Sequence, residues 1–169
     1  PLRQNGEPLS GMGSEFAFLN TNKRSLRLDL RAPAGLYELN GLLGVADAVI
    51  ESSAPDPLTP VSGQMGNDQI VRVYISPFGL SGPYAAYRSN VFTDDAISGH
   101  MGLSGERDRE PIKRAGLHTH FQAGMHAFIG CMSALLARER IGHGQIVEVS
   151  HMEGMAALHQ HTISAWTHG

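Results

Sequence analysis

The chain has 169 residues, 41% of them hydrophobic, and its 13 basic and 16 acidic side chains give a formal charge of −3. This length and composition suit one domain with a hydrophobic core, and the weak charge argues against a nucleic-acid or membrane-surface partner. No apolar run reaches the roughly 18 residues of a membrane-spanning helix, and the single cysteine, Cys131, excludes an internal disulfide and favours a reducing, cytoplasmic compartment.

The first part of the chain contains two short predicted strands on either side of a helix. Residues 1–15 are rich in Gly and Ser and predict an irregular segment, whereas alternating apolar and polar side chains over residues 26–30 predict a strand. Pro33, followed by leucines at helical spacing, predicts a helix that ends at Gly44, and residues 48–51 predict a second strand. The sequence does not begin with methionine, and we expect it to be part of a longer protein.

The middle of the chain combines loops with one clear strand. Residues 52–69 contain several prolines and glycines and predict a long loop. Residues 70–75 are rich in β-branched side chains and predict a strand, and a turn-dense loop follows from Ser76. Residues 91–103 predict a short helix, and residues 106–110 predict a charged turn.

The longest predicted helix covers residues 118–140. Large apolar side chains recur every three or four residues along it and predict the face that packs into the core. These side chains are Phe121, Met125, Phe128, Met132 and Leu135. Small residues between them would allow another element to approach closely. Residues 146–150 predict a further strand, and residues 152–163 predict a final helix.

The order of these elements predicts an α/β domain with parallel strands, because strands alternate with helices along the chain. Binding sites in such domains form beyond the carboxyl ends of the strands. This directs attention to the loop that begins at Ser76 and to the residues after Ser150. We interpret His126, His151 and His159 as packed or surface histidines.

Three stretches carry a resemblance to a known family. Residues 20–30 read NTNKRSLRLDL, residues 75–84 read ISPFGLSGPY, and residues 123–150 combine a helix, a glycine turn and a strand. Together and in this order they resemble the class III coenzyme A transferases. This CaiB/BaiF family includes formyl-CoA transferase and α-methylacyl-CoA racemase.

The resemblance implies a Rossmann-like large domain with mostly parallel strands, incomplete at both ends. It assigns residues 1–150 to this CoA-binding domain and residues 151–169 to a helix that leads toward a small domain outside this chain. The implied activity is CoA transfer between an acyl-CoA and a carboxylic acid, with the CoA thioester as substrate and no covalently bound cofactor. The implied protein partner is a second copy of the chain in an interlocked homodimer.

The family's catalytic nucleophile is an aspartate shortly before the glycine of the long helix, and alignment on Gly124 places His120 at that position. The aspartate carries CoA as a thioester, which an imidazole cannot form. Three hypotheses stay open: His120 is a general acid or base, Asp94 or Asp95 supplies the carboxylate, or the chain is a non-catalytic CoA-binding or dimerisation module. The histidine of the racemase relatives matches a position near Asn90, which disfavours the racemase alternative.

Two short segments contain candidate contacts to CoA. The segment over residues 22–24 offers cations and hydrogen-bond donors to the phosphates of CoA; the alternative interpretation is a solvated loop. The segment over residues 76–79 contains glycine, which would let backbone N–H groups approach the thioester or pantetheine; the alternative interpretation is an ordinary turn-rich connection. The candidates are Asn22, Lys23 and Arg24 in the first segment and Ser76, Phe78 and Gly79 in the second.

The nine histidines raise the question of a metal site. His118 and His120 are two residues apart, as are His159 and His161, and helical residues at this spacing point about 200° apart. The sequence contains neither a cysteine pair nor an HExxH motif. We therefore expect no metal site.

Overall fold

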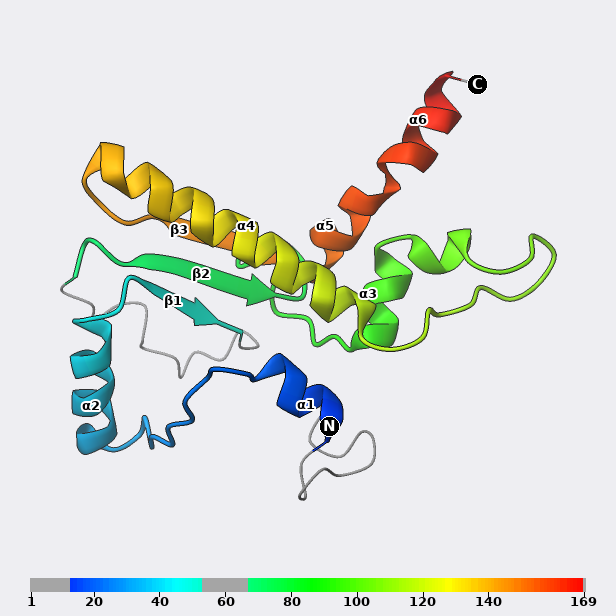
Figure 1. The fold of residues 1–169 in the computed structure, drawn as a ribbon. Helices are drawn as coiled ribbons and strands as arrows, with labels where there is room; N and C mark the ends of the chain where they lie inside the picture. The colour runs from blue at the N-terminus through cyan, green and yellow to red at the C-terminus, as the bar shows by residue number, and fades with distance from the viewer. Residues whose placement is uncertain (1–12, 53–66, 169) are drawn as a thin grey trace. The chain divides into compact units, whose positions relative to one another are not determined.

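A computed structural model describes residues 13–52 and 67–168 of the chain (Figure 1). The chain divides into two compact units, Pro1–Leu39 and Asn40–Gly169. Most of the irregular segment predicted over residues 1–15, and most of the loop predicted over residues 52–69, lie outside the described residues.

The first unit contains a helix, α1 (Ser14–Leu19), which begins where the sequence predicts irregular structure. The residues after α1 close its carboxyl end. The Asn20 side-chain amide donates to the Phe16 carbonyl at 2.9 Å, and Lys23 Nζ donates to the Leu19 carbonyl at 2.8 Å. These side-chain contacts add hydrogen bonds to carbonyls of the last turn of α1.

The strand predicted over residues 26–30 is wrong. Residues 23–29 have no regular secondary structure, and Leu26 is 60% exposed. Alternation specifies a strand only where a neighbouring strand supplies the hydrogen bonds of a ladder and a buried face for the apolar side chains. Neither condition can be read from the five residues alone.

Helix α2 (Pro33–Leu43) confirms the predicted helix, with proline in the first turn. A turn at Asp29 precedes it: the Asp29 carbonyl accepts from Ala32 N at 3.1 Å, and its carboxylate accepts from Arg31 N at 3.0 Å. Gly35 packs directly on this turn, because a Cβ there would lie 2.2 Å from the Asp29 carbonyl oxygen.

The second unit is built on a parallel sheet whose strands are β1 (Ala48–Glu51), β2 (Val71–Ser76) and β3 (Ile146–Ser150), in that order (Figure 1). Val73 pairs with Ile50 on one side and with Val147 on the other. The strands predicted over residues 48–51, 70–75 and 146–150 are confirmed, and so is the α/β class with parallel strands. Because the strands are parallel, their carboxyl ends meet at one edge of the sheet.

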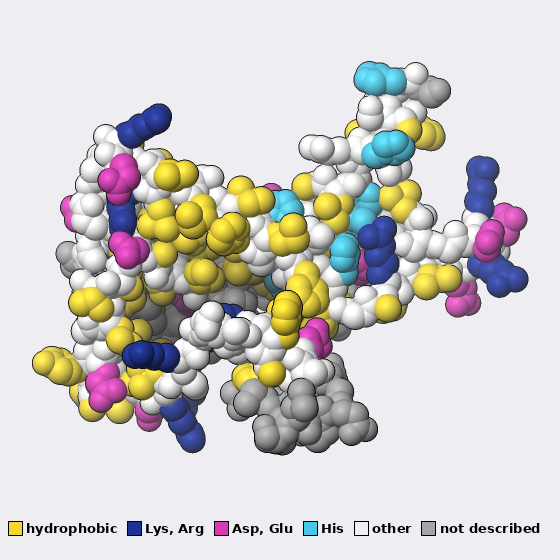
Figure 2. All heavy atoms as spheres, in the orientation of Figure 1, with side chains coloured by type: hydrophobic (Ala, Val, Ile, Leu, Met, Phe, Trp, Pro, Cys, Tyr) yellow, Lys and Arg dark blue, Asp and Glu magenta, His cyan; other side chains and the backbone are white. Residues whose placement is uncertain are grey.

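Helix α4 (His118–Ile141) packs along this sheet and confirms the longest predicted helix. Its sheet-facing side is the small one, formed by Ala123, Ala127, Cys131 and Ala134, which join Val71, Val73 and Val149 in the core. Of the large residues predicted to form the core face, Leu135 packs against the core. The others are instead turned outward: Phe121, Met125, Phe128 and Met132 are 42–65% exposed. Figure 2 shows the resulting band of hydrophobic side chains over α4.

The physical reason for this correction is the distance between helix and sheet. At Gly130, a Cβ would lie 2.6 Å from Cγ1 of Val147 on β3, so there is no room for a side chain. Close approach selects the small side of the helix, whereas hydrophobic periodicity alone selects the large side.

Two of the remaining helices, α3 (Val91–Ile97) and α5 (His151–Ala156), pack against α4. Helix α3 and the 3-10 helix η3 (His100–Leu103) replace the continuous helix predicted over residues 91–103, because Gly99 between them has a φ of 87°. The final helix is likewise split into α5, η4 (Ala157–His159) and α6 (Gln160–His168). Helices α3, α4 and α5 contact one another.

Within the two described ranges, none of the helices combines the length and the apolar character that crossing a membrane requires.

Candidate functional site

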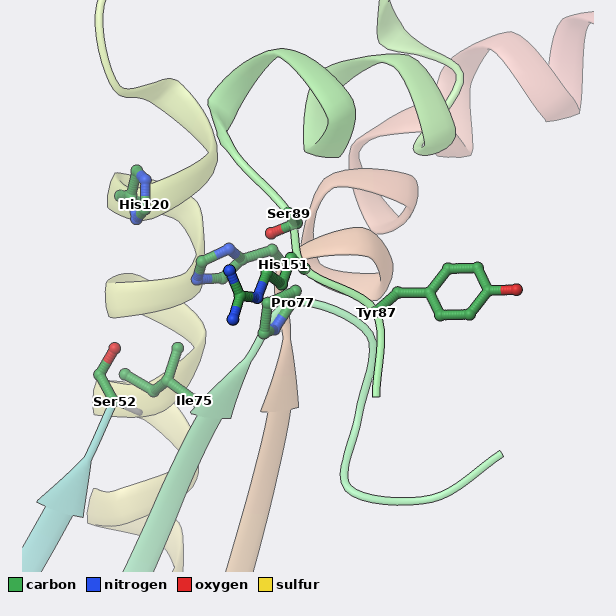
Figure 3. Close-up of a pocket in the computed structure, with 8 residues that line it drawn as sticks. Ser52, Ile75, Pro77, Tyr87, Ser89, His120 and His151 are labelled. Carbon is green, nitrogen blue, oxygen red and sulfur yellow. The ribbon is translucent and has the colours of Figure 1, made fainter. Parts of the chain in front are cut away.

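A pocket of about 430 Å³ opens beyond the carboxyl ends of the three strands. Ser52 follows β1, Pro77 follows β2 and His151 follows β3, while His120 comes from the first turn of α4 (Figure 3). This is the place where parallel α/β sheets form their sites. The lining consists of Ser52, Ile75, Pro77, Tyr87, Arg88, Ser89, His120 and His151.

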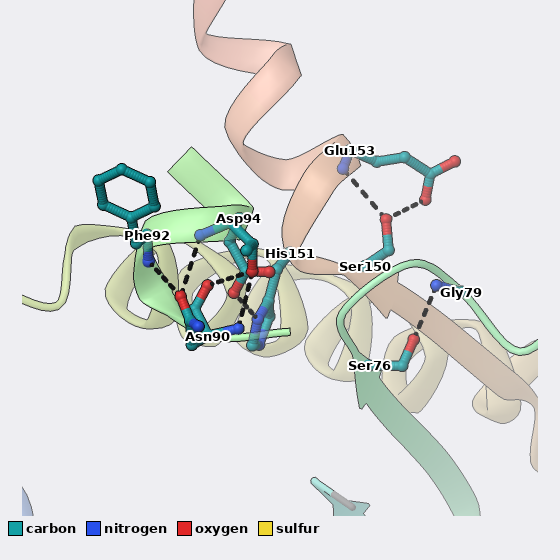
Figure 4. Close-up of polar contacts among 9 residues, drawn as sticks. Ser76, Gly79, Asn90, Phe92, Asp94, Ser150, His151 and Glu153 are labelled. Carbon is teal, nitrogen blue, oxygen red and sulfur yellow. Dashed lines mark hydrogen bonds and ion pairs between the residues drawn. The ribbon is translucent and has the colours of Figure 1, made fainter. Parts of the chain in front are cut away.

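His151 is positioned by the turn from β3 into α5. Ser150 ends β3 and caps α5: its hydroxyl accepts from Glu153 N at 3.0 Å and donates to the Glu153 carboxylate at 2.7 Å (Figure 4). This cap fixes the first turn of α5 and therefore the direction of His151. The His151 side chain is nearly buried, yet it lines the pocket.

Asp94 of α3 holds the His151 ring. Its Oδ2 lies 2.9 Å from His151 Nδ1, and Asp94 is 1% exposed. Helix α3 is itself fixed by Asn90, whose side chain accepts from Phe92 N at 2.9 Å and from Thr93 N at 3.0 Å (Figure 4). A buried carboxylate bonded to one imidazole nitrogen leaves the other nitrogen available for chemistry.

His120 lies beside His151, with ring centroids 4.9 Å apart and the rings nearly perpendicular. Desolvation in this setting lowers the pKa of His120, the neighbouring His151 lowers that pKa further, and the Asp94 carboxylate opposes the change. The His120 side chain lines the pocket and is nevertheless exposed to solvent. A lowered pKa keeps the imidazole neutral near pH 7, where it can accept a proton.

Asp94 and Asp95, the two candidate carboxylates, do not line the pocket. Asp95 is 2% exposed, and its Oδ2 accepts from Arg114 N at 3.3 Å. A nucleophile must reach the thioester carbon. Burial therefore favours a supporting role for both carboxylates, which Asp94 performs for His151.

The loop after β2 is held by its own contacts. The buried Ser76 hydroxyl accepts from Gly79 N at 3.0 Å, and Leu80 N donates to the Glu148 carboxylate. Phe78 packs on Tyr84, with ring centroids 6.3 Å apart. Two backbone N–H groups of this loop thus already have partners within the chain. None of the three candidates Ser76, Phe78 and Gly79 lines the described pocket; from this loop, Pro77 does.

The other three CoA candidates, Asn22, Lys23 and Arg24, lie in the first unit, and all three are exposed. Asn22 has a φ of 64° in the turn that follows α1, and Lys23 closes α1 through the Leu19 carbonyl. The pocket belongs entirely to the second unit.

Sequence reasoning did not place His151 and Arg88 in the lining of this pocket. The interpretation of His151 as a packed histidine agrees with its burial, and its place directly after a predicted strand was the available signal for the pocket. Arg88 sits in a turn-dense segment without a distinguishing motif. Among the described residues, no group of three or more His, Cys, Asp or Glu side chains is arranged to hold a metal ion.

Comparison with known proteins identifies relatives of the chain. The family profile described as CoA-transferase family III matches residues 1–169. The chain is 29% identical to succinyl-CoA:(R)-benzylsuccinate CoA-transferase subunit BbsE of Thauera aromatica, over 98% of the chain and 43% of the relative. It is 28% identical to succinate–glutarate CoA-transferase of Agrobacterium fabrum, over 90% of the chain and 39% of the relative.

A solved structure shares the fold. The crystal structure of a CaiB/BaiF family protein from Brucella suis superimposes with a TM-score of 0.88 at 28% identity, covering 98% of this chain and 47% of that one. The chain therefore spans less than half of the length of the relatives that it matches.

Proposed function

Because the chain belongs to CoA-transferase family III, we propose that it forms part of an enzyme that transfers CoA from an acyl-CoA to a carboxylic acid. The names of both relatives describe CoA transfer involving carboxylic acids. The observation that carries the proposal is the pocket beyond β1, β2 and β3, which combines Arg88 with two imidazoles. The CoA thioester is a substrate, and no covalently bound cofactor takes part.

Arg88 is the group that suits the carboxylic acid. It carries the permanent positive charge among the lining residues, and none of the lining residues in the described ranges is acidic. A guanidinium pairs with a carboxylate through two parallel hydrogen bonds, which also fixes the direction of the acid. Arg88 therefore orients one carboxylate oxygen toward the thioester.

The transfer proceeds without a carboxylate on the enzyme. The acid's oxygen attacks the thioester carbon, the C–S bond breaks, and a mixed anhydride forms beside the CoA thiolate. The thiolate then attacks the anhydride carbonyl that came from the acceptor acid. This gives the new acyl-CoA and releases the acyl group of the starting acyl-CoA as a carboxylate. A neutral His120 contributes an N–H donor to the oxyanion of either step.

The test supplies succinyl-CoA together with a panel of mono- and dicarboxylic acids and follows new acyl-CoA esters by chromatography and mass spectrometry. We expect at least one new CoA ester, formed at the expense of succinyl-CoA. A folded protein that forms no new ester with any acid would overturn the proposal.

The second candidate is a non-catalytic CoA-binding or dimerisation module. The observation in its favour is that no carboxylate lines the pocket in the described part of the chain. This candidate predicts CoA binding by calorimetry without any change in the bound thioester. The racemase alternative is weaker, since Asn90 uses its side chain to cap α3.

We also propose that the protein is a cytoplasmic homodimer. The hydrophobic band on α4, defined by Phe121, Met125, Phe128 and Met132, supports a second copy as the covering partner. The reduced, buried Cys131 agrees with a cytoplasmic location. Residues 1–150 would then belong to the large CoA-binding domain and residues 151–169 to the helix that leaves it.

A further inference from the structure

The contact between Asp94 and His151 has the geometry of a general-base pair. The 2.9 Å bond between Asp94 Oδ2 and His151 Nδ1 joins two side chains that are 1% and 9% exposed. An ionised carboxylate only accepts hydrogen bonds, so Nδ1 carries the proton and Nε2 carries the lone pair. Asp94 Oδ1 has no hydrogen-bond partner among the described residues, which leaves His151 as the partner of this carboxylate's side-chain oxygens.

The pocket in front of this pair holds no group that can store an acyl or CoA moiety as the family's aspartate does. In the described part of the chain its lining offers hydroxyls and imidazoles but neither a carboxylate nor a thiol. Ser52, Tyr87 and Arg88 are exposed, so solvent reaches the pocket. When no carboxylic acid occupies Arg88, water is therefore the nucleophile at hand.

We propose that this pocket also hydrolyses acyl-CoA thioesters, with His151 as the general base for water and Asp94 as its positioning residue. The substrate class rests on the proposed function, whereas the reaction rests on the Asp94–His151 geometry. The neighbouring His120 supports the assignment, because a neutral ring 4.9 Å away does not repel the proton that His151 takes up.

The reaction balances with water as the second substrate. The water oxygen bonds to the thioester carbon while its proton moves to His151 Nε2. The tetrahedral intermediate then collapses, the C–S bond breaks, and the CoA sulfur leaves with the proton returned from Nε2. The products are a carboxylic acid and the free thiol of CoA, and the imidazole regains its starting state.

The experiment measures release of CoA thiol from acetyl-CoA, without any acceptor acid, by a colorimetric thiol reagent. In water enriched in ¹⁸O the released acetate should contain the label. We expect His151→Gln to lower the rate by roughly 100-fold or more. Asp94→Asn should lower kcat by at least about tenfold, because the amide would hold the His151 imidazole in the wrong tautomer. KM should stay within about twofold, because the pocket that binds the substrate is intact.

His143→Gln is the matched control, since His143 is exposed and lies in the turn between α4 and β3. It should retain the unaltered rate. Thermal melting verifies folding of each variant, and if His151→Gln does not fold, the kcat and KM of Asp94→Asn decide the proposal.

Each other outcome overturns the inference. If the protein transfers CoA to an acid but releases no CoA thiol when the acid is absent, the proposed function stands and the hydrolysis proposal is overturned. Thiol release that survives His151→Gln would remove the general-base assignment, and an acylated protein seen by mass spectrometry would replace direct attack by water. Failure to bind or turn over acetyl-CoA and succinyl-CoA at all would remove both proposals.

Discussion

Gly130 on α4 faces Val147 on β3 so closely that a Cβ would lie 2.6 Å from Val147 Cγ1. Valine is stiff about its χ1 angle, so this methyl group cannot simply move aside. The contact sets the separation of helix and sheet, and with it the place of the first turn of α4 that carries His120.

We expect Gly130→Ala to lower the free energy of unfolding by about 1–3 kcal/mol, the usual cost of overpacking. Gly124→Ala, on the same helix but with no atom within 4 Å of the added Cβ, should raise it by up to about 1 kcal/mol through helix propensity. Chemical denaturation of the two variants measures both changes. Equal effects would contradict the close packing at Gly130.

Stability should fall as the pH drops through about 6.5, because His100 resists protonation in the folded state. Burial lowers the pKa of His100, and His159 and Arg114 lower it further, while Asp95 and the bond to the Met155 carbonyl oppose the change. The His159 and His118 rings lie 4.2 and 6.4 Å from that of His100.

The sign follows from proton binding. The unfolded chain takes up the His100 proton near pH 6.5 and the folded chain only at lower pH, so acid favours unfolding. We expect the melting temperature to decline between about pH 7.5 and pH 5.5. His100→Gln should flatten this slope, leaving the contribution of His120, whereas the exposed His161→Gln should not alter it. An unchanged slope in His100→Gln would refute the assignment.

His120→Asp should restore a covalent route. If His120 stands where the family's nucleophilic aspartate does, a carboxylate at this position faces the pocket and can carry CoA as a thioester. We expect incubation with acetyl-CoA to add the mass of CoA less one water to the protein, and hydroxylamine to remove it. Phe121→Asp, one residue along α4 and outside the lining, should remain unmodified. Modification of both variants, or of neither, would argue against the equivalence.

Arg88→Gln should weaken use of the carboxylic acid. Loss of a charge-assisted contact of about 1.5–3 kcal/mol corresponds to a rise in KM for the acid of roughly 10- to 100-fold. The KM for acyl-CoA should change much less. Arg140→Gln is the control, because Arg140 is exposed in the last turn of α4. If Arg88→Gln leaves the KM for the acid unchanged, the acid binds at another place.

The hydrophobic band on α4 should control association. Phe128 is 65% exposed, and a charge at its centre, as in Phe128→Asp, should shift the protein from dimer to monomer in size-exclusion chromatography with light scattering. Leu103→Asp, at a 52% exposed position off α4, should leave the dimer intact. A monomeric unaltered protein would remove the dimer proposal.

Local patterns in the sequence were sufficient for most elements. Strands β1, β2 and β3 are confirmed because β-branched runs and short apolar segments match buried parallel strands. Helix α2 is confirmed by its proline start, and α4 by its length and its closing glycine, Gly142, whose φ is 79°. The resemblance of residues 20–30, 75–84 and 123–150 was sufficient for the family.

Tertiary structure decided what those patterns leave open. Residues 26–30 alternate like a strand but form none, because a ladder needs a neighbour that alternation does not specify. Helix α4 buries its alanines and not its phenylalanines, because the separation from β3 is set by contacts such as Gly130 with Val147. His151 and Asp94 are 57 residues apart in the chain, and their pairing exists only because α3 and α5 pack together at the amino-terminal end of α4. Spacing in sequence carries no information about such a contact, since it depends on how separate elements fold back onto one another.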